Sequence, residues 1–298
     1  MADRPVPKNN YKFVSSDGHN LFRERFGSLS DDEWCQLLVH SINNRTIDGV
    51  EFPTFPDSDL QNLIHGHYGE SAIIEAAKFF RFVKKNTYQY PKNASNKRLL
   101  DFGCGWGRII RPFMRDFEFS NLYGFEPNFQ FCALSRTLNP YVTFFSGAFV
   151  PTDSLPYQFF DLVVGWSIFS HLSPSSATLW LREAARIIVP GGHCVFTTWG
   201  DRFLRRLKNE SLARAAGKEI HWYSSVCLDA AGSIEQLLEK YEQGDFVWFT
   251  GGKSSLYGEA FIGEPALKWL ISQNSLPFSV VLFDKESLGQ DAFVLKRL

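Results

Sequence analysis

Leu99-Leu100-Asp101-Phe102-Gly103-Cys104-Gly105-Trp106-Gly107 is the stretch that decides the fold of this chain. An apolar strand ends in an acid, a glycine-rich turn follows, and the pattern predicts a helix that begins at Gly107. Glycines in such a turn let the backbone bend tightly and approach a ligand closely, and the N–H groups at the start of a helix favour a polar ligand. The stretch therefore predicts a binding site at the carboxyl end of a strand.

Strands and helices alternate through the centre of the chain, which is typical of right-handed βαβ units and a parallel sheet. We predict an α/β fold with a Rossmann-like, seven-stranded sheet, mostly parallel, with an antiparallel C-terminal hairpin strand. The expected strands cover residues 98–102, 121–126, 142–146, 160–165, 193–199, 278–283 and 292–296, and the expected helices between them cover 107–116, 127–138 and 174–188.

Two further regions surround this core. Helical periodicity at residues 30–45, 59–65 and 71–86 predicts an N-terminal helical extension or lid over residues 1–91. The α/β domain then covers residues 92–298, with an insert at about 201–277 between strands five and six.

The composition of the chain limits which partners and which cellular compartment we expect. The formal net charge of -1 argues against a nucleic-acid partner, which would call for a basic face. The sequence shows no signal peptide and no apolar run of the ~20 residues that span a bilayer. Five cysteines without a C-x-x-C pair fit reduced thiols, so we expect a cytoplasmic protein: Cys35, Cys104, Cys132, Cys194 and Cys227.

The identity of the ligand follows from the acid at the strand end. A dinucleotide loop usually reads G-x-G-x-x-G and holds a pyrophosphate, whereas the glycines here read G-x-G-x-G. Asp101 would repel a pyrophosphate but attract an ammonium group, which favours S-adenosylmethionine (SAM) over NAD. Glu126 closes the second strand 19 positions after Gly107, where a carboxylate can accept hydrogen bonds from both ribose hydroxyls.

At the third strand the chain resembles the class I SAM-dependent methyltransferases, over roughly residues 98–200. Phe160-Asp161-Leu162-Val163-Val164 is similar to the fourth strand of that family, and Val189-Pro190-Gly191-Gly192 to the turn before its fifth. Together with Ser167-Ile168-Phe169-Ser170-His171-Leu172, these motifs resemble those of a bacterial subgroup of the family. The genes of that subgroup are often found with surface-glycan and natural-product genes. Tyr257-Gly258-Glu259-Ala260-Phe261 and Gln290-Asp291 also have counterparts there.

The resemblance implies an acid after strand three that bonds the adenine amine, and this sequence departs from it with Gly147-Ala148-Phe149. The Ala148 backbone and stacking by Phe149 could serve instead, and Phe149 could equally be a core residue. The predicted cofactor-binding residues are Asp101, Gly103, Cys104, Gly105, Gly107, Glu126, Pro127, Ala148, Phe149, Trp166 and Ser167.

Chemistry is expected after strand four, because ligands of open α/β sheets bind beyond the carboxyl ends of the strands. His171 is the candidate general base for a hydroxyl nucleophile, the alternative being a residue that shapes the loop or caps a helix. The insert supplies the candidate substrate-binding residues Tyr257, Glu259, His221 and Tyr223. His65-Gly66-His67 has a spacing that occurs in metal sites, but no neighbouring acid or cysteine pattern completes a set, so we predict no metal.

The function predicted from these residues is SAM-dependent O-methylation of a sugar, glycan or small-molecule hydroxyl. Two alternatives stay open at this point: a NAD-dependent oxidoreductase or epimerase, and a non-catalytic SAM-binding protein. The sequence leaves open the acceptor, whether oxygen, nitrogen or carbon is methylated, and the oligomeric state.

Overall fold

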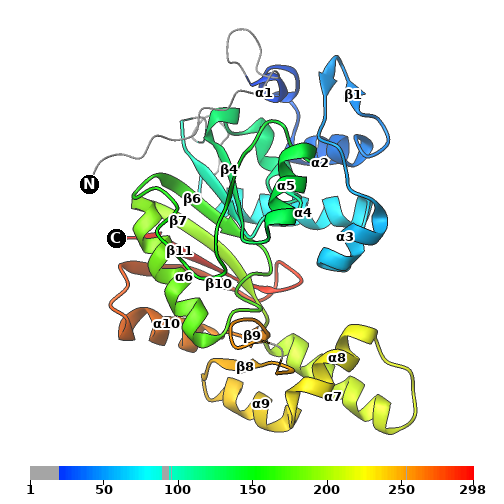
Figure 1. Cartoon of the computed structure of the whole chain (residues 1–298), viewed down its shortest axis with the longest axis vertical. Helices are drawn as coiled ribbons and strands as arrows, with labels where there is room; N and C mark the ends of the chain where they lie inside the picture. The colour runs from blue at the N-terminus through cyan, green and yellow to red at the C-terminus, as the bar shows by residue number, and fades with distance from the viewer. Residues whose placement is uncertain (1–19, 89–93, 95, 253) are drawn as a thin grey trace. The chain divides into compact units, whose positions relative to one another are not determined.

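The computed structural model describes residues 20–88, 94, 96–252 and 254–298 (Figure 1). Seven strands form one sheet in the order β10-β11-β7-β6-β3-β4-β5. The mostly parallel sheet with an antiparallel C-terminal strand confirms the predicted fold class. No helix in the described part of the chain is long and apolar enough to cross a membrane.

The chain divides into two compact units, Met1–Trp166 with Ile187–His193, and Ser167–Arg186 with Cys194–Leu298. The domain boundary expected at residues 91 and 92 lies outside the described residues, as do residues 1–19 of the predicted N-terminal extension.

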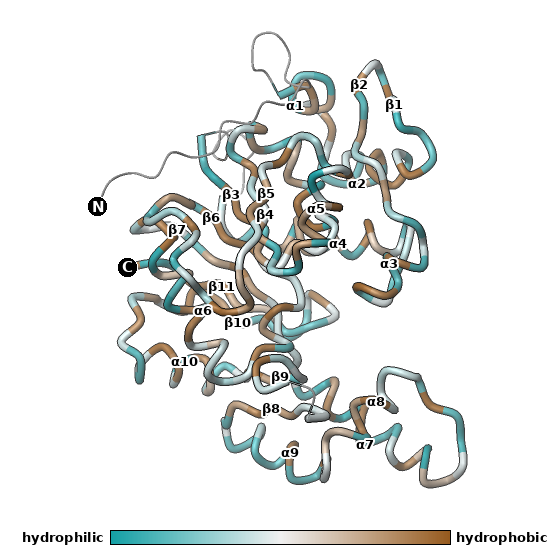
Figure 2. The backbone as a smooth tube through the Cα atoms, viewed as in Figure 1, coloured by the Kyte–Doolittle hydropathy of each residue, from teal (hydrophilic) through white to brown (hydrophobic). Residues whose placement is uncertain are grey.

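The first unit is built on parallel strands. β3 pairs in parallel with β4 on one side and with β6 on the other, so the strand order reverses at β3. Figure 2 shows hydrophobic stretches along these strands, interrupted by more polar residues. Nearly all residues of β3, β4 and β6 are buried, as expected for strands covered on both faces. Their bounds are β3 (Leu99–Phe102), β4 (Leu122–Glu126), β5 (Thr143–Ser146) and β6 (Phe160–Gly165), with α5 (Phe129–Leu138) between β4 and β5.

The helix predicted over residues 107–116 is wrong. Turns follow the glycines, and a 3-10 helix covers Arg111–Arg115, with another at Phe119–Asn121. Pro112 lacks the N–H that a continuing α-helix needs. Residues 106–117 are also buried throughout, so the segment has no solvent-facing stripe. No α-helix therefore begins at Gly107, and the N–H groups of a helix start do not contribute to ligand binding at this loop.

The N-terminal helices form largely where the sequence predicts. Ser30 caps α2 and forms a capping box with Glu33, which confirms that helix start. The sequence missed α1 and the small β1–β2 hairpin, because both are too short to show a period. The elements are α1 (Leu21–Phe26), α2 (Asp31–His40), β1 (Thr46–Ile47), β2 (Val50–Glu51), α3 (Ser58–His65) and α4 (Glu70–Asn86).

β7 (Ile188–Thr198) is longer than predicted, because the chain stays extended through the expected turn at residues 189–192. A Cβ at Gly192 would lie 2.9 Å from the Asp161 carbonyl oxygen, so close packing explains this glycine. In the second unit, the Oγ of Ser173 accepts a hydrogen bond from the Ser176 amide at the start of α6 (Pro174–Ile187). The predicted closing hairpin is confirmed as the antiparallel pair β10 (Phe278–Asp284) and β11 (Asp291–Arg297), preceded by α10 (Glu264–Gln273).

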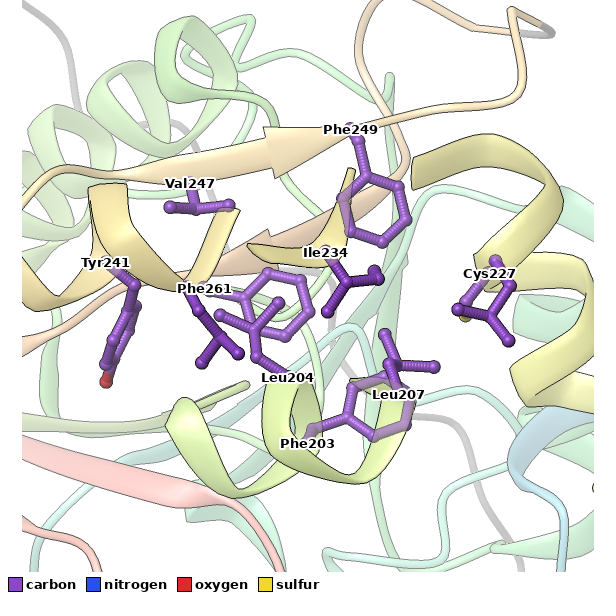
Figure 3. Close-up of a cluster of buried hydrophobic side chains, with 11 residues drawn as sticks. Phe203, Leu204, Leu207, Cys227, Ile234, Tyr241, Val247, Phe249 and Phe261 are labelled. Carbon is purple, nitrogen blue, oxygen red and sulfur yellow. The ribbon is translucent and has the colours of Figure 1, made fainter. Parts of the chain in front are cut away.

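Within the second unit, the insert has its own apolar core (Figure 3). Phe203, Leu204 and Leu207 from one helix meet Phe249 and Phe261 from the two strands. The sequence missed one helix, α8, and one strand, β9. The elements are α7 (Asp201–Ala215), α8 (Trp222–Ala231), α9 (Ile234–Glu242), β8 (Val247–Phe249) and β9 (Glu259–Phe261).

Candidate functional site

Asp101 is the next-to-last residue of β3 and is a buried acid, 1% exposed. Neither carboxylate oxygen meets a hydrogen-bond donor at bonding distance and angle within the described chain. Burial raises the pKa of Asp101 to about 8, and the nearby Glu126 adds to this rise, whereas the Arg108 guanidinium and the Ile110 amide oppose it. A buried acid without a direct partner is costly, so the position suits a cationic ligand group.

Arg108, which the sequence analysis did not single out, is a counter-charge that opposes the rise in the pKa of Asp101. It is 4% exposed, and its Nη1 lies 2.8 Å from Oε2 of Glu75 on α4. The same atom donates to the Ala72 carbonyl at 3.0 Å. Because Arg108 is held by these groups of α4, it only partly compensates Asp101.

The glycine loop has the backbone that its composition predicts. Gly103, Gly105 and Gly107 have φ values of +70°, +55° and +82°, which L side chains rarely adopt. A Cβ at Gly107 would lie 2.5 Å from Nδ2 of Asn139, so only glycine fits there. The amides of Gly103 and Cys104 donate to the Phe125 carbonyl at 2.8 and 3.0 Å, which ties the loop to β4.

Glu126 closes β4 and faces the same loop. Its Oε2 accepts from the Gly105 amide and its Oε1 from the Asn128 amide, both at 2.9 Å. Burial raises the pKa of Glu126, and these two backbone hydrogen bonds oppose that rise. Each oxygen keeps a second lone pair for a hydroxyl donor, and Pro127 is half-buried beside it.

α3 lies over the loop within the same unit. Nε1 of Trp106 donates to Nε2 of His65 at 2.9 Å, and the Ile64 side chain lies 3.5 Å from where a Gly105 Cβ would be. Burial lowers the pKa of His65 to about 3, which keeps the ring neutral and able to accept this bond. The two histidines of the His65-Gly66-His67 pattern therefore have different environments, since His67 lies 3.9 Å from Glu75.

Two aromatic candidates of the first unit differ in exposure. Phe149 is 59% exposed, so its assignment as a core residue is wrong, and Ala148 beside it is also exposed. Trp166 packs edge-on against Phe79 of α4, with ring centroids 5.2 Å apart. Phe149 is thus largely accessible to solvent, whereas Trp166 is anchored to the helical extension.

Ser167 begins the loop after β6 with a φ of +60°. Its amide donates to Oγ1 of Thr197 at 2.7 Å, and its Oγ accepts from Nε2 of Gln290 at 2.8 Å. Oγ1 of Thr197 donates to Oε1 of Gln290 at 2.6 Å, which closes the ring of contacts. A non-glycine residue in this conformation costs about 1–3 kcal/mol, so the network holds a strained turn in place.

His171 follows in the same loop, and a hydrogen bond to the backbone orients its ring. Its Nδ1 lies 2.9 Å from the Gly258 carbonyl oxygen. A carbonyl only accepts, so Nδ1 carries the proton and donates, and Nε2 of the neutral ring is left with a free lone pair. Oε1 of Glu259 lies 3.7 Å from the same Nδ1.

The substrate candidates of the insert gather around His171. The Tyr257 ring stacks on the His171 ring at 4.8 Å and is 54% exposed. The Tyr223 hydroxyl donates to Oε1 of Glu259 at 2.8 Å. His221 instead caps α8, where its Nδ1 accepts from the Tyr223 amide at 3.3 Å.

The roles of several site residues escaped sequence reasoning. Gly258 holds the His171 ring, and Trp199 donates from Nε1 to Oε2 of Glu259 at 2.9 Å. Thr197 and Gln290 hold Ser167. Gly258 and Gln290 stand in motifs that carry the family resemblance, but no local pattern shows these contacts, because each residue acts on a partner far away in the sequence.

The basic residues of α7 do not form a free cationic face. Arg205 pairs with Asp201 and Glu242, Arg206 pairs with Glu210, and Arg214 pairs with Asp229. These pairs agree with a solvated helix surface. They remove the main positive patch that an anionic partner could use.

The residues of the first unit fit SAM. The buried Asp101, whose charge is only partly compensated, suits the α-ammonium group, Glu126 suits the ribose hydroxyls, and the glycines leave room for close approach of a ligand. Neither acid suits a pyrophosphate, which would bring more negative charge beside them.

Comparisons with known proteins agree with SAM as the ligand. The model of the methyltransferase domain family matches residues 74–241, more than half of the chain. SAM-bound CalS10, an amino pentose methyltransferase from Micromonospora echinaspora involved in calicheamicin biosynthesis, is 16% identical with a TM-score of 0.50. This match covers 82% of this chain and 98% of CalS10. A Listeria monocytogenes protein described as an S-adenosylmethionine-dependent methyltransferase is 12% identical with a TM-score of 0.52. That match covers 75% of this chain and 99% of the other.

At these identities the structural likeness shows the fold alone, whereas the family match covers the cofactor loop and the strands around it. It selects the methyltransferase interpretation over an oxidoreductase or a protein without catalysis. The chain belongs to the methyltransferase domain family and is a SAM-dependent methyltransferase.

Proposed function

We propose that this enzyme methylates a hydroxyl oxygen of a sugar, glycan or other small molecule, with His171 as the general base. The observation that carries the proposal is the tautomer of His171. Because Nδ1 donates to the Gly258 carbonyl at 2.9 Å, Nε2 is the basic atom of the neutral ring. Within the described chain Nε2 makes no hydrogen bond, which leaves it available to an acceptor hydroxyl.

The cofactor is held in this proposal by residues of the first unit. Asp101 faces the ammonium group, Glu126 the ribose hydroxyls, and the exposed Phe149 ring the adenine. When bound, SAM supplies a methyl group on a positively charged sulfur. Trp166 and Ser167 continue from β6, the strand beside β3, and complete the predicted set.

The role of His171 is to remove the proton that a hydroxyl loses on methylation. As the bond from the acceptor oxygen to the methyl carbon forms, Nε2 takes the hydroxyl proton, and the electron pair of the carbon–sulfur bond stays with sulfur. A positioned base of this kind contributes about 10²–10⁴-fold to a rate. Alignment of the acceptor supplies most of the remainder.

The preference for a sugar-like acceptor rests on the ring stack at His171. The Tyr257 ring is half exposed beside the proposed base, and such a flat face packs against a sugar ring or another apolar ring face. CalS10, whose fold is similar, acts on an amino pentose. We therefore favour a small sugar-type acceptor over a macromolecule.

We also propose that the N-terminal helices act as a lid and that the enzyme works in the cytoplasm. The contact of α3 with the glycine loop through Ile64 and the His65–Trp106 hydrogen bond supports the lid. Five buried cysteines without disulfides support a reducing compartment.

A methyl-transfer assay tests the proposal. Purified enzyme is incubated with methyl-labelled SAM and a panel of nucleotide-linked and free sugars, with small phenols and amines for comparison. We expect His171→Ala to lower kcat for a hydroxyl acceptor about 10²-fold or more and to leave the Kd for SAM unchanged by calorimetry. His40→Ala, an exposed histidine on α2, is the matched control and should keep wild-type turnover. Wild-type turnover by His171→Ala, or transfer to amines alone, would refute the proposal.

A further inference from the structure

Glu259 is a buried carboxylate that the proposed reaction has not yet used. It lies at the start of β9, with a side chain 15% exposed, and its Oε1 is 3.7 Å from Nδ1 of His171. The His171 side chain is likewise 15% exposed. A carboxylate and an imidazole from distant segments thus face each other with little solvent between them.

Two donors hold Glu259 in this position. Nε1 of Trp199 donates to Oε2 at 2.9 Å, and the Tyr223 hydroxyl donates to Oε1 at 2.8 Å. Both oxygens therefore act as acceptors, which is the pattern of an ionised carboxylate. Burial raises the pKa of Glu259, while His171 and these two hydrogen bonds oppose the rise.

The backbone around the pair is also tied together. The Gly258 amide donates to the His171 carbonyl at 2.8 Å, and the Ala260 amide donates to the Ser170 carbonyl at 2.8 Å. Leu172 and Tyr257 form an antiparallel bridge between these two segments. A Cβ at Gly258 would lie 2.3 Å from the Phe249 carbonyl oxygen, so this close pairing requires glycine.

The core of the insert anchors both donors. Phe203, labelled in Figure 3, lies 4.4 Å from the Trp199 ring and 6.1 Å from the Tyr223 ring, centroid to centroid. Phe261, two residues after Glu259, packs on the same Phe203 ring at 6.0 Å. The carboxylate is thus fixed by a packed core rather than by a mobile loop.

We infer that Glu259 is a positioning residue for His171, which orients the imidazole and stabilises the imidazolium that forms when Nε2 takes a proton. This inference rests on the proposed function. The acceptor hydroxyl loses its proton to Nε2, its oxygen bonds to the methyl carbon, and sulfur keeps the electron pair of the broken bond. The positive charge that leaves the sulfonium thus reappears on His171, beside the Glu259 carboxylate.

Burial keeps the Tyr223 phenol and the Cys227 thiol beside the pair neutral near pH 7. Burial raises the pKa of Tyr223 above its usual range and the pKa of the Cys227 thiol to about 12. Tyr257 contributes a phenol stacked on the imidazole. Arg206 and Glu210 of α7, which also act on Cys227, neutralise each other in a 2.7 Å ion pair. The carboxylate nearest to the His171 ring is therefore that of Glu259, 3.7 Å from Nδ1.

The primary test is Glu259→Gln, which keeps the shape of the side chain and removes its charge. We expect the titration midpoint of the His171 ring, followed by NMR of 15N-histidine-labelled enzyme, to fall by about one pH unit. The spectrum of His171→Gln assigns the resonance. Glu264→Gln on α10, whose exposed carboxylate pairs with Lys268 at 2.8 Å, is the matched control and should leave the midpoint unchanged.

Kinetics give the second readout. With any acceptor found in the transfer assay, Glu259→Gln should lower kcat roughly tenfold or more, keep KM for the acceptor within about threefold, and move the acidic limb of the pH–rate profile to lower pH. Tyr223→Phe keeps the carboxylate and its charge but removes one of its two donors, so it should give a smaller change of the same kind and serves if Glu259→Gln folds poorly. Melting temperature reports on folding in each variant.

The outcomes separate this inference from the proposed function. An unchanged His171 midpoint in folded Glu259→Gln overturns the inference, as does a rise in acceptor KM with kcat and pH profile intact, which would make Glu259 a substrate contact. Wild-type turnover in His171→Ala would instead overturn the proposed base, whatever the midpoint does.

Discussion

The Gly105 amide donates to Oε2 of Glu126 at 2.9 Å, so the turn after β3 is bound to the acid that closes β4. This one hydrogen bond joins the two motifs from which we propose that the cofactor site is built. It also means that Glu126 has two tasks, since the same carboxylate shapes the loop and is proposed to receive the ribose.

Glu126→Ala should therefore weaken SAM binding and loosen the free protein together. A hydrogen bond to a charged group contributes about 1.5–3 kcal/mol, so we expect the Kd for SAM to rise about 10- to 100-fold. Calorimetric titration measures the affinity, and the melting temperature of the free enzyme measures the loop contribution. Glu118→Ala, outside the loop, is the control. Unaltered SAM affinity in Glu126→Ala would remove Glu126 from the site.

Asp101 should make the free enzyme less stable as pH rises. Burial raises its pKa to about 8 from an ordinary value of 3.8. Between about pH 4 and pH 8 the folded state holds a proton that the unfolded state has released, so the free energy of unfolding falls across this window and the full cost is present above it. Asp101→Asn should melt higher than wild type at pH 8.5, and each kcal/mol corresponds to about 2–4 °C. Equal melting curves for both proteins at pH 8.5 would contradict this.

SAM binding should release a proton from Asp101. A bound ammonium group favours the charged carboxylate, so the pKa of Asp101 falls when the cofactor binds. At pH 6.5, where the α-ammonium is charged, calorimetry in two buffers of different ionisation enthalpy should show the release of about one proton. Asp101→Asn should bind SAM more weakly and lose the buffer dependence. A buffer dependence that survives in this variant would assign the proton to another group.

Gly107→Ala should destabilise the enzyme more than Gly191→Ala. Both glycines have a left-handed backbone, with φ of +82° and +81°, but a Cβ at Gly107 meets Asn139 at 2.5 Å whereas one at Gly191 meets nothing within 4 Å. Arg111 and the Trp106 carbonyl hold the Asn139 side chain, so it cannot move away cheaply. We expect Gly191→Ala to cost about 1–3 kcal/mol and Gly107→Ala about 1–3 kcal/mol more in urea unfolding. Equal costs would show that the loop relaxes around the methyl group.

Arg115 should be essential for attaching the N-terminal helices. Its side chain is 2% exposed, and it pairs with Asp31 of α2 and, at 3.0 Å, with the fully buried Asp116. Arg115→Met leaves buried carboxylates with less compensation, which typically costs about 3–5 kcal/mol. Arg81→Met, which breaks the exposed pair of Arg81 with Asp32, should cost less than about 1 kcal/mol. Similar losses for the two variants would show that the buried pair contributes no more than a surface one.

The fold and the cofactor half of the site could be predicted from local sequence. Asp101 and Glu126 each lie at or next to the end of a strand, and parallel neighbours carry their carboxyl ends to one edge of a sheet, so adjacency follows from the strand pattern. The helix expected from Gly107 onward failed because burial and Pro112 override the local signal. Phe149 could not be assigned from sequence, since an exposed and a core phenylalanine look alike.

The arrangement around His171 could not be predicted in the same way. The sequence by itself determined a βαβ sheet, an acid and three glycines at the end of one strand, and a histidine after another, because these patterns depend on neighbours within a few residues. Only the tertiary structure decided which nitrogen of His171 is basic and that Glu259 lies beside it. Those facts depend on the Gly258 carbonyl and on the pairing of residues 170–172 with 257–260, and chain segments so far apart meet only when the insert folds around its own core.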